Sequence, residues 1–191
     1  MSDVVFVDSN ILIYAHDADA GEKRTKSVET LRQLWDSGAG RMSVQVLQEF
    51  YVNVTKKLTT PVASSTAREV VNAYGAWIRK PTSAATVTRA IDIAALAQIQ
   101  FWDALIVACA EEADATYVYS EDLNSGQIIA GVNVVNPLVA AKTMNRRYRP
   151  TNSALSPLPS TKMREARAVQ RPVGRVRDSK FAMRPRRHGF E

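Results

Sequence analysis

The sequence FWDALIVACA, residues 101–110, decides the fold of this chain. Residues 102–112 carry apolar side chains on nearly every face of a helix, and such a helix is buried on all sides. One carboxylate, Asp103, lies in its first turn among apolar neighbours. An unpaired charge there is costly, and the helix N-terminus offsets only about 1 kcal/mol of that cost. The stretch therefore predicts a central helix and a carboxylate with a cationic partner.

Short strands and amphipathic helices alternate on both sides of this helix. β-branched and aromatic runs predict strands at residues 4–7, 86–88, 116–120 and 132–135, and a short strand that ends at Met42 and Ser43. Helical spacing of apolar residues predicts helices at residues 11–16, 22–35, 44–58, 67–78 and 90–97. Ser43 is the expected N-cap of the third of these. This order predicts an α/β fold, a three-layer α/β/α sandwich with a central parallel sheet.

Length and composition set the broad class of the protein. The chain has 191 residues, 46% of them hydrophobic and 23% charged, which suffices for one core. No run approaches the roughly 20 apolar residues of a membrane span, so we expect a soluble, cytoplasmic protein. Cys109 is the only cysteine, which excludes an internal disulfide and a thiolate metal cluster.

The net charge of +6 is unevenly distributed along the chain. Residues 1–143 contain 12 Lys and Arg and 16 Asp and Glu, a net charge of −4; residues 144–191 contain 13 and 3, a net charge of +10. Prolines are scattered through the basic segment. We expect one folded domain over residues 1–143 and a disordered basic tail over residues 144–191. Such a tail either binds RNA phosphates or only increases solubility, and charge alone does not decide between them.

Four acids follow predicted strands or begin the next helix. They are Asp8, Glu49, Asp103 and Asp122. The carboxyl ends of parallel strands meet at one edge of the sheet, so these side chains are expected to converge there. Grouped carboxylates repel one another unless a cation such as Mg²⁺ or Mn²⁺ joins them, or their pKa values rise. The metal is the simpler interpretation.

Three of the acids also have ordinary structural interpretations. Asp8 is a good N-cap for the helix that follows it. Glu49 lies on the side of its helix opposite the apolar stripe, which suits a solvated side chain as well as the rim of a cleft. Asp122 stands before a turn, and its neighbour Glu121 leaves open which of the two acids faces the site.

The acids lie in five motifs along the chain or beside them: FVDSNILIYA (6–15), SVQVLQEFY (43–51), FWDALIVACA (101–110), YSEDLNSGQ (119–127) and GVNVVNP (131–137). In order and separation these pieces resemble the successive motifs of PIN-domain nucleases, in particular the VapC-like ribonuclease toxins of type II toxin-antitoxin pairs. The resemblance covers residues 4–138. It departs from the family in Glu121, which adds a carboxylate, and in the long tail.

The resemblance also implies roles for individual residues. Asp8 and Asp103 match the principal metal-binding aspartates, and Glu49 matches the motif glutamate. Asp122 matches the acid that follows the hydroxyl residue of the last motif, here Ser120. Asn10 matches a polar position that supports the metal ligands. The implied protein is a Mg²⁺-dependent endoribonuclease, with Mn²⁺ as a substitute, that forms a homodimer and is paired with a small antitoxin.

Other function classes fit less well. The only histidines are His16 and His188, which disfavours the two-histidine mechanism of metal-independent ribonucleases. A phosphoacceptor receiver needs a late lysine after a strand, where this chain has Asn136, and a haloacid-dehalogenase-type phosphatase needs an acid where it has Asn10. A housekeeping RNA-processing nuclease and a non-catalytic RNA-binding module on the same fold stay open as alternatives.

Overall fold

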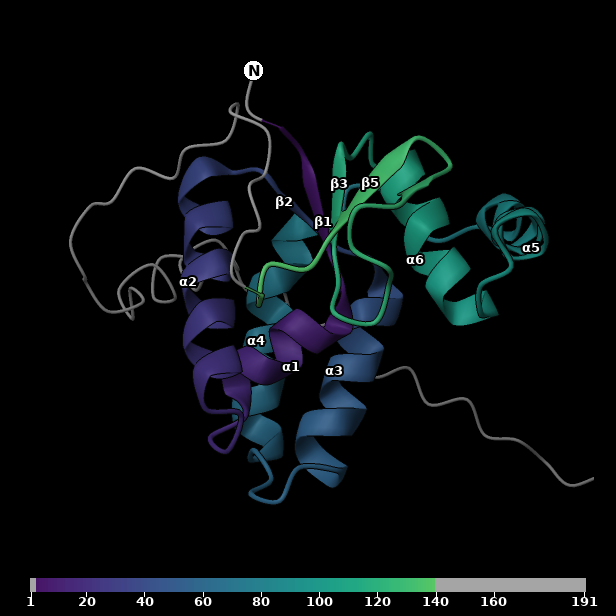
Figure 1. Ribbon diagram of the computed structural model, residues 1–191. Coiled ribbons are helices and arrows are strands. Elements are labelled where there is room, and N and C mark those ends of the chain that lie inside the picture. The colour runs from purple at the N-terminus through teal and green to yellow at the C-terminus, as the bar shows by residue number, and fades with distance from the viewer. Residues whose placement is uncertain (1–2, 140–191) are drawn as a thin grey trace, which may run out of the picture. The chain divides into compact units, whose positions relative to one another are not determined.

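The computed structural model describes residues 3–139 (Figure 1). The expected basic tail and its boundary at residue 144 lie outside this range. The elements, in chain order, are β1 (Val5–Val7), α1 (Ser9–His16), α2 (Glu22–Ser37), β2 (Gly40–Arg41), α3 (Val44–Lys56), α4 (Ser64–Tyr74), the 3₁₀ turn η1 (Gly75–Trp77), α5 (Ala84–Ala97), α6 (Phe101–Glu112), β3 (Tyr117–Tyr119), β4 (Ile128–Ile129) and β5 (Val132–Val135).

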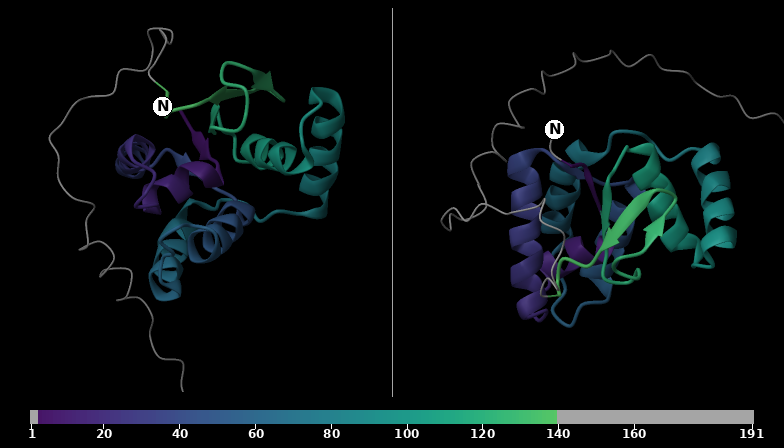
Figure 2. Two further views of the ribbon diagram at one scale, coloured as in Figure 1. Left: turned by 60° about the horizontal axis from the view of Figure 1, so that its bottom comes forward. Right: turned by 45° about the horizontal axis from the view of Figure 1, so that its top comes forward.

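The strands form one sheet in the order β2-β1-β3-β5-β4. β2, β1, β3 and β5 are parallel, with Val5 opposite Gly40 and Tyr117, and Tyr119 opposite Val135. The helices α1 and α2 lie on one side of this sheet and α5 and α6 on the other (Figures 1 and 2). The predicted α/β/α sandwich around a mainly parallel sheet is therefore confirmed.

α6 is the central helix that its sequence predicts. Seven consecutive residues, 104–110, are buried in it. One face packs against β3 and β5, and α5 covers another face. Since both sides of α6 meet protein, an apolar residue is favoured at every position of those two turns.

β4 is the one antiparallel strand of the sheet, and it was not expected. It pairs with β5 through a two-residue turn, in which Ala130 has φ 49° and Gly131 has φ 81°. Two successive residues with positive φ define the type I′ hairpin turn, and glycine adopts that conformation without a steric penalty.

Two strand predictions were wrong in detail. Residues 86–88 belong to α5, because Ser83 forms a capping box with Thr86: the Ser83 hydroxyl accepts from the Thr86 N–H and the Thr86 hydroxyl accepts from the Ser83 N–H. This cap outweighs the strand preference of a β-branched run. The second strand, β2, ends at Arg41, one residue before Met42. Its first residue, Gly40, packs directly against the Trp77 ring, and a Cβ at this position would lie within 2.6 Å of ring carbons.

Within residues 3–139, no single helix is long and apolar enough to cross a membrane. Only α5 and α6 taken together reach the required length and composition, and they meet at a bend of 117°.

Candidate active site

Asp8 lies at the carboxyl end of β1 and caps the N-terminus of α1. Its Oδ1 accepts from the Ser9 backbone N–H at 2.6 Å. Its Oδ2 accepts from the Ser120 hydroxyl at 2.7 Å and from the Asn10 amide at 3.0 Å. The side chain is only 6% exposed. Asp8 is thus an N-cap, as one interpretation of the sequence had it, and at the same time a buried carboxylate at the edge where the strands end.

Asn10 joins two of the acids. Its Nδ2 lies 3.0 Å from an Asp8 oxygen and 3.1 Å from an Asp122 oxygen, and its Oδ1 accepts from the Glu121 backbone N–H at 3.4 Å. The side chain is buried. A single amide therefore fixes the end of β1 relative to the loop after β3.

Ser120 organises that loop. Its buried hydroxyl donates to Asp8 and accepts from the backbone N–H groups of Asp122 at 3.1 Å and Leu123 at 3.4 Å. Accepting backbone N–H groups two and three residues ahead is the pattern of a Ser turn. This turn places Asp122 beside Asn10 and Asp8.

Glu49 reaches the same region from α3. Its Oε2 accepts from the Ser9 hydroxyl at 2.6 Å, and its Oε1 accepts from the Gln45 amide at 2.8 Å. Glu49, on the side of α3 opposite its apolar stripe, therefore lies at the rim of the acidic cluster. This is one of the two interpretations of Glu49 that the sequence allowed.

Asp103 lies partly buried in the first turn of α6. Within residues 3–139 no hydrogen bond to its carboxylate was found. Burial raises the pKa of Asp103, and the negative charges of Asp122 and Glu49 raise it further. The structure therefore brings all four predicted acids into electrostatic contact: Asp8, Glu49, Asp103 and Asp122.

The pKa of Asp8 shows the effect of burying this carboxylate. Burial is the main cause that raises it, to about 6; hydrogen bonds from Ser120 and Ser9 oppose the shift, and the charges of Glu49 and Asp122 add to it. A carboxylate that is buried among other carboxylates is stabilised in its charged form by a bound cation.

Glu121 does not join the cluster. Its carboxylate accepts from the Tyr14 hydroxyl at 2.5 Å and forms an ion pair with Lys23 at 2.7 Å. The ammonium group of Lys23 also lies 4.7 Å from the centre of the Tyr14 ring. The expectation that Glu121 adds a carboxylate to the site is therefore wrong, and of the two neighbouring acids it is Asp122 that faces Asp8.

The structure also places two residues at the site that were not singled out from the sequence, Ser9 and Gln45. Gln45 is 7% exposed and donates to Glu49 and, at 3.4 Å, to the backbone carbonyl of Trp102. Its Oε1 is buried and has no hydrogen-bond donor among the described residues. The spacing of Gln45 and Glu49, four residues apart on a helix, was the signal that could have revealed this contact.

The residues fit a hard divalent cation by the chemistry of their donors. The cluster offers carboxylate oxygens only, which Mg²⁺ and Mn²⁺ prefer, and Gln45 Oε1 is an acceptor for a water or other ligand donor. Within residues 3–139 no three Asp, Glu, His or Cys side chains are arranged to hold one ion. Mg²⁺ does not require such a cage, because it keeps several waters and binds through one or two carboxylates.

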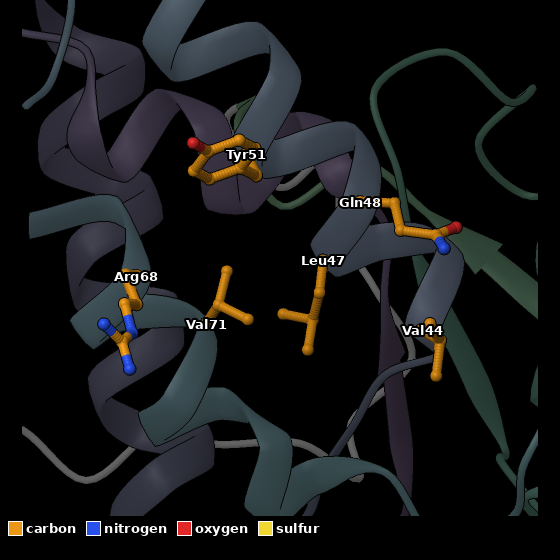
Figure 3. Close-up of a pocket in the computed structure, with 6 residues that line it drawn as sticks. All are labelled: Val44, Leu47, Gln48, Tyr51, Arg68 and Val71. Carbon is orange, nitrogen blue, oxygen red and sulfur yellow. The ribbon is translucent and has the colours of Figure 1, made fainter. Parts of the chain in front are cut away.

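A separate pocket of about 330 Å³ lies between α3 and α4 (Figure 3). Leu47 and Val71 face each other across it, with Tyr51 and Arg68 at its rim. It is lined almost wholly by carbon and contains no carboxylate. This pocket is therefore distinct from the acidic cluster.

Comparison with known proteins assigns the fold to a family. The PIN domain family matches residues 5–128, which is well over half of the chain, and the chain therefore belongs to that family. Among solved structures, a match is Mycobacterium tuberculosis VapC20, described as a sarcin-ricin loop cleaving toxin. It is 17% identical and covers 62% of this chain and 89% of its own, with a TM-score of 0.47. No curated protein matches the sequence.

Proposed function

We propose that this protein is a Mg²⁺-dependent endoribonuclease that hydrolyses RNA phosphodiester bonds in the cytoplasm. The observation that carries the proposal is the convergence of Asp8, Glu49, Asp103 and Asp122 at the carboxyl edge of the sheet in a PIN domain. PIN domains are generally nucleases. Within residues 3–139 none of these four acids forms an ion pair with a cationic side chain, and such a group of carboxylates is suited to metal-assisted hydrolysis.

Asp8 and Asp103 are the proposed principal metal ligands, with Glu49 and Asp122 completing the site. When bound, Mg²⁺ or Mn²⁺ lowers the pKa of a coordinated water and stabilises the departing oxygen. The chain's own contribution is to hold the carboxylates in place: Ser120 and Asn10 orient Asp8, and Ser9 orients Glu49. These hydrogen bonds restrict the rotation of the ligands before the metal binds.

Within residues 3–139 the only histidine is His16, and its contacts do not suit the role of general base. His16 Nδ1 lies 2.9 Å from the Leu12 carbonyl, the ring packs edge-on against Phe50 at 5.1 Å, and burial lowers its pKa. A half-buried, neutral ring that is already hydrogen-bonded to its own helix is poorly placed to move a proton on a substrate. This supports a mechanism in which the carboxylates and their cation activate water.

The proposed biological role is that of the toxin in a VapBC-type pair, as a homodimer that a small antitoxin inhibits. The order and spacing of the motifs support this role. The apolar pocket between α3 and α4 offers a surface suited to apolar side chains of a protein partner.

Sequencing of RNA ends after brief expression of the chain without a partner tests the activity and the role together. The proposal predicts growth arrest, new RNA ends at defined positions, and relief of both by the product of a small adjacent gene. Growth unaffected by protein that cleaves RNA when purified would favour a housekeeping RNA-processing nuclease. No cleavage by folded protein with Mg²⁺ would contradict the enzyme assignment.

A further inference from the structure

Trp102 is an unusually exposed tryptophan that directly neighbours the cluster residue Asp103 in sequence. Its side chain is 62% exposed, and it directly precedes Asp103 in the first turn of α6. The ring contacts Phe101 edge-on, with 5.3 Å between centroids. Trp35 and Trp77, in contrast, pack against each other and against Tyr74 in the aromatic cluster near η1. An indole left in solvent on the helical turn that carries a site residue is suited to receive a ligand.

Trp102 is connected to the site through Gln45. The Gln45 amide nitrogen donates both to the Trp102 carbonyl at 3.4 Å and to Glu49 at 2.8 Å. The first turn of α6 and the first turn of α3 are therefore held together at the edge of the cluster. The buried Gln45 Oε1 has no donor among the described residues, so this edge also has an unused hydrogen-bond acceptor.

The charge of the surrounding protein makes an uncharged contact valuable here. Residues 3–139 contain 11 Lys and Arg against 16 Asp and Glu, a net charge of −5. Four of these cations are already engaged in ion pairs: Lys23, Lys26, Arg32 and Arg89. The net charge of the described part of the chain therefore does not favour phosphates, and base stacking on an aromatic ring is the contact that single-stranded nucleic acid offers independently of charge.

We propose that the Trp102 indole is a stacking platform for a nucleobase of single-stranded RNA next to the bond that is cleaved, and that Gln45 holds this platform at the site. The inference rests on the proposed function and adds to it how the substrate is positioned. Because every base has a flat face, Trp102 contributes affinity for any sequence and distinguishes single strands, whose bases are free, from paired ones.

Binding of a short single-stranded RNA to the full chain in chelating buffer tests this proposal, because cleavage does not interfere. High salt reduces the contribution of phosphate contacts, including those of the basic tail. RNA should quench the fluorescence of Trp102. Trp102→Leu should weaken binding about tenfold or more, whereas Trp102→Phe, which keeps an aromatic ring, should restore most of it. Leu96→Ala, at an 82% exposed position on α5, is the control and should bind as wild type.

An abasic oligonucleotide of the same length separates stacking from attraction to phosphates. It should bind wild type and Trp102→Leu equally and should leave the fluorescence unchanged. Equal RNA affinity of wild type and Trp102→Leu would overturn the proposal. It would also be overturned if Trp102→Leu weakened binding of RNA and of the abasic oligonucleotide by the same factor. If Trp102→Leu changes the oligomeric state and leaves RNA affinity intact, the indole belongs to a protein interface and the proposal is also overturned.

Steady-state kinetics of RNA cleavage show whether this inference or the proposed function has failed. With Mg²⁺, Trp102→Leu should raise KM about tenfold and leave kcat near the wild-type value, because stacking aids binding and leaves the carboxylates in place. Wild-type cleavage with an unchanged KM in Trp102→Leu overturns the inference alone. Absence of cleavage in all variants, with quenching by RNA retained, overturns the nuclease and leaves the stacking contact standing.

Discussion

Asp8 combines two demands on one side chain, since it caps α1 and lies buried among other acids. Its pKa is raised from 3.8 to about 6, so the folded metal-free protein holds this proton more tightly than the unfolded chain does. Below pH 3.8 Asp8 is protonated in both the folded and the unfolded state, so it does not lower the free energy of unfolding. As the pH rises from there through 6, Asp8 lowers this free energy progressively. Above pH 6 the loss is on the order of 3 kcal/mol. Glu49 and Asp122 are the charged groups that raise its pKa further.

Asp8→Asn should therefore stabilise the metal-free protein at pH 7, because asparagine is also a good N-cap and carries no charge. The gain over wild type should shrink as the pH is lowered toward 4. Urea denaturation in chelating buffer at several pH values measures it. Mg²⁺ should stabilise wild type and have little effect on the variant. A variant less stable than wild type at pH 7 would contradict this account of the site.

Asn10 is the residue whose amide joins Asp8 to Asp122. Asn10→Ala should reduce RNA cleavage about 10- to 100-fold, the usual effect of removing a group that orients metal ligands. Raising the Mg²⁺ concentration should recover part of the loss. Asn124→Ala, in the exposed part of the same loop, is the matched control and should cleave at the wild-type rate. Equal rates in the two variants would show that the Asn10 contacts have no role in catalysis.

At the level of residues, the sequence predicted which acids converge but could not assign every side chain. Asp8 and Asp122 follow strands whose ends have clear local signals, so their placement follows from the topology. Glu121 and Asp122 are adjacent acids, and local sequence does not distinguish them. The choice is made by Tyr14 and Lys23, about a hundred residues earlier in the chain, which pair with Glu121 in the folded protein.

At the level of elements, predictions were sound where one pattern extended over several turns, as in α6. They were wrong at residues 86–88, where a β-branched run lies inside a helix. The deciding signal was Ser83 three residues before Thr86, whose side chains complete a capping box, and Thr86 also donates to Glu112 on α6 at 2.8 Å. β2 and β4, of two residues each, carry too few side chains for a periodic pattern.

Ser83→Ala should lower the free energy of unfolding by about 1 kcal/mol, because α5 loses its N-cap. Ser83→Asp should restore most of that loss, since aspartate also accepts from the backbone at this position. Urea denaturation provides the measurement. Ser64→Ala, in the first turn of α4, removes no side-chain cap and should change stability little. If both alanine variants have wild-type stability, the capping box does not determine where α5 begins.

At the level of the whole molecule, charge is divided between two parts of the chain. Residues 3–139 carry −5 and residues 140–191 carry +11. The described chain ends just after β5, whose carboxyl end lies at the same sheet edge as Asp8 and Ser120, and Lys26 holds the Leu138 carbonyl there at 2.8 Å. The last described residues therefore follow a strand whose carboxyl end lies at the edge where the candidate site lies.

Truncation after Lys142 should preserve folding, metal binding and the bond that is cut, while weakening RNA binding at low salt. It should also flatten the salt dependence, since each neutralised phosphate contributes roughly −0.7 to the log-log slope for single strands. Binding titrations at several salt concentrations measure both effects. If truncation unfolds the protein or moves the cleavage position, the boundary near residue 144 is wrong and the tail belongs to the catalytic domain.

The most direct test of the central claim is the rate of RNA cleavage by purified full-length protein with and without Mg²⁺, compared between wild type and Asp103→Asn. Asp114→Asn is the matched control, because Asp114 is an exposed residue just after α6 with φ 54°, a conformation that asparagine tolerates well. Wild type and Asp114→Asn should cleave only with the metal present, and Asp103→Asn should be folded but inactive. Cleavage by Asp103→Asn at the wild-type rate, or wild-type cleavage that persists in chelating buffer, would contradict the assignment.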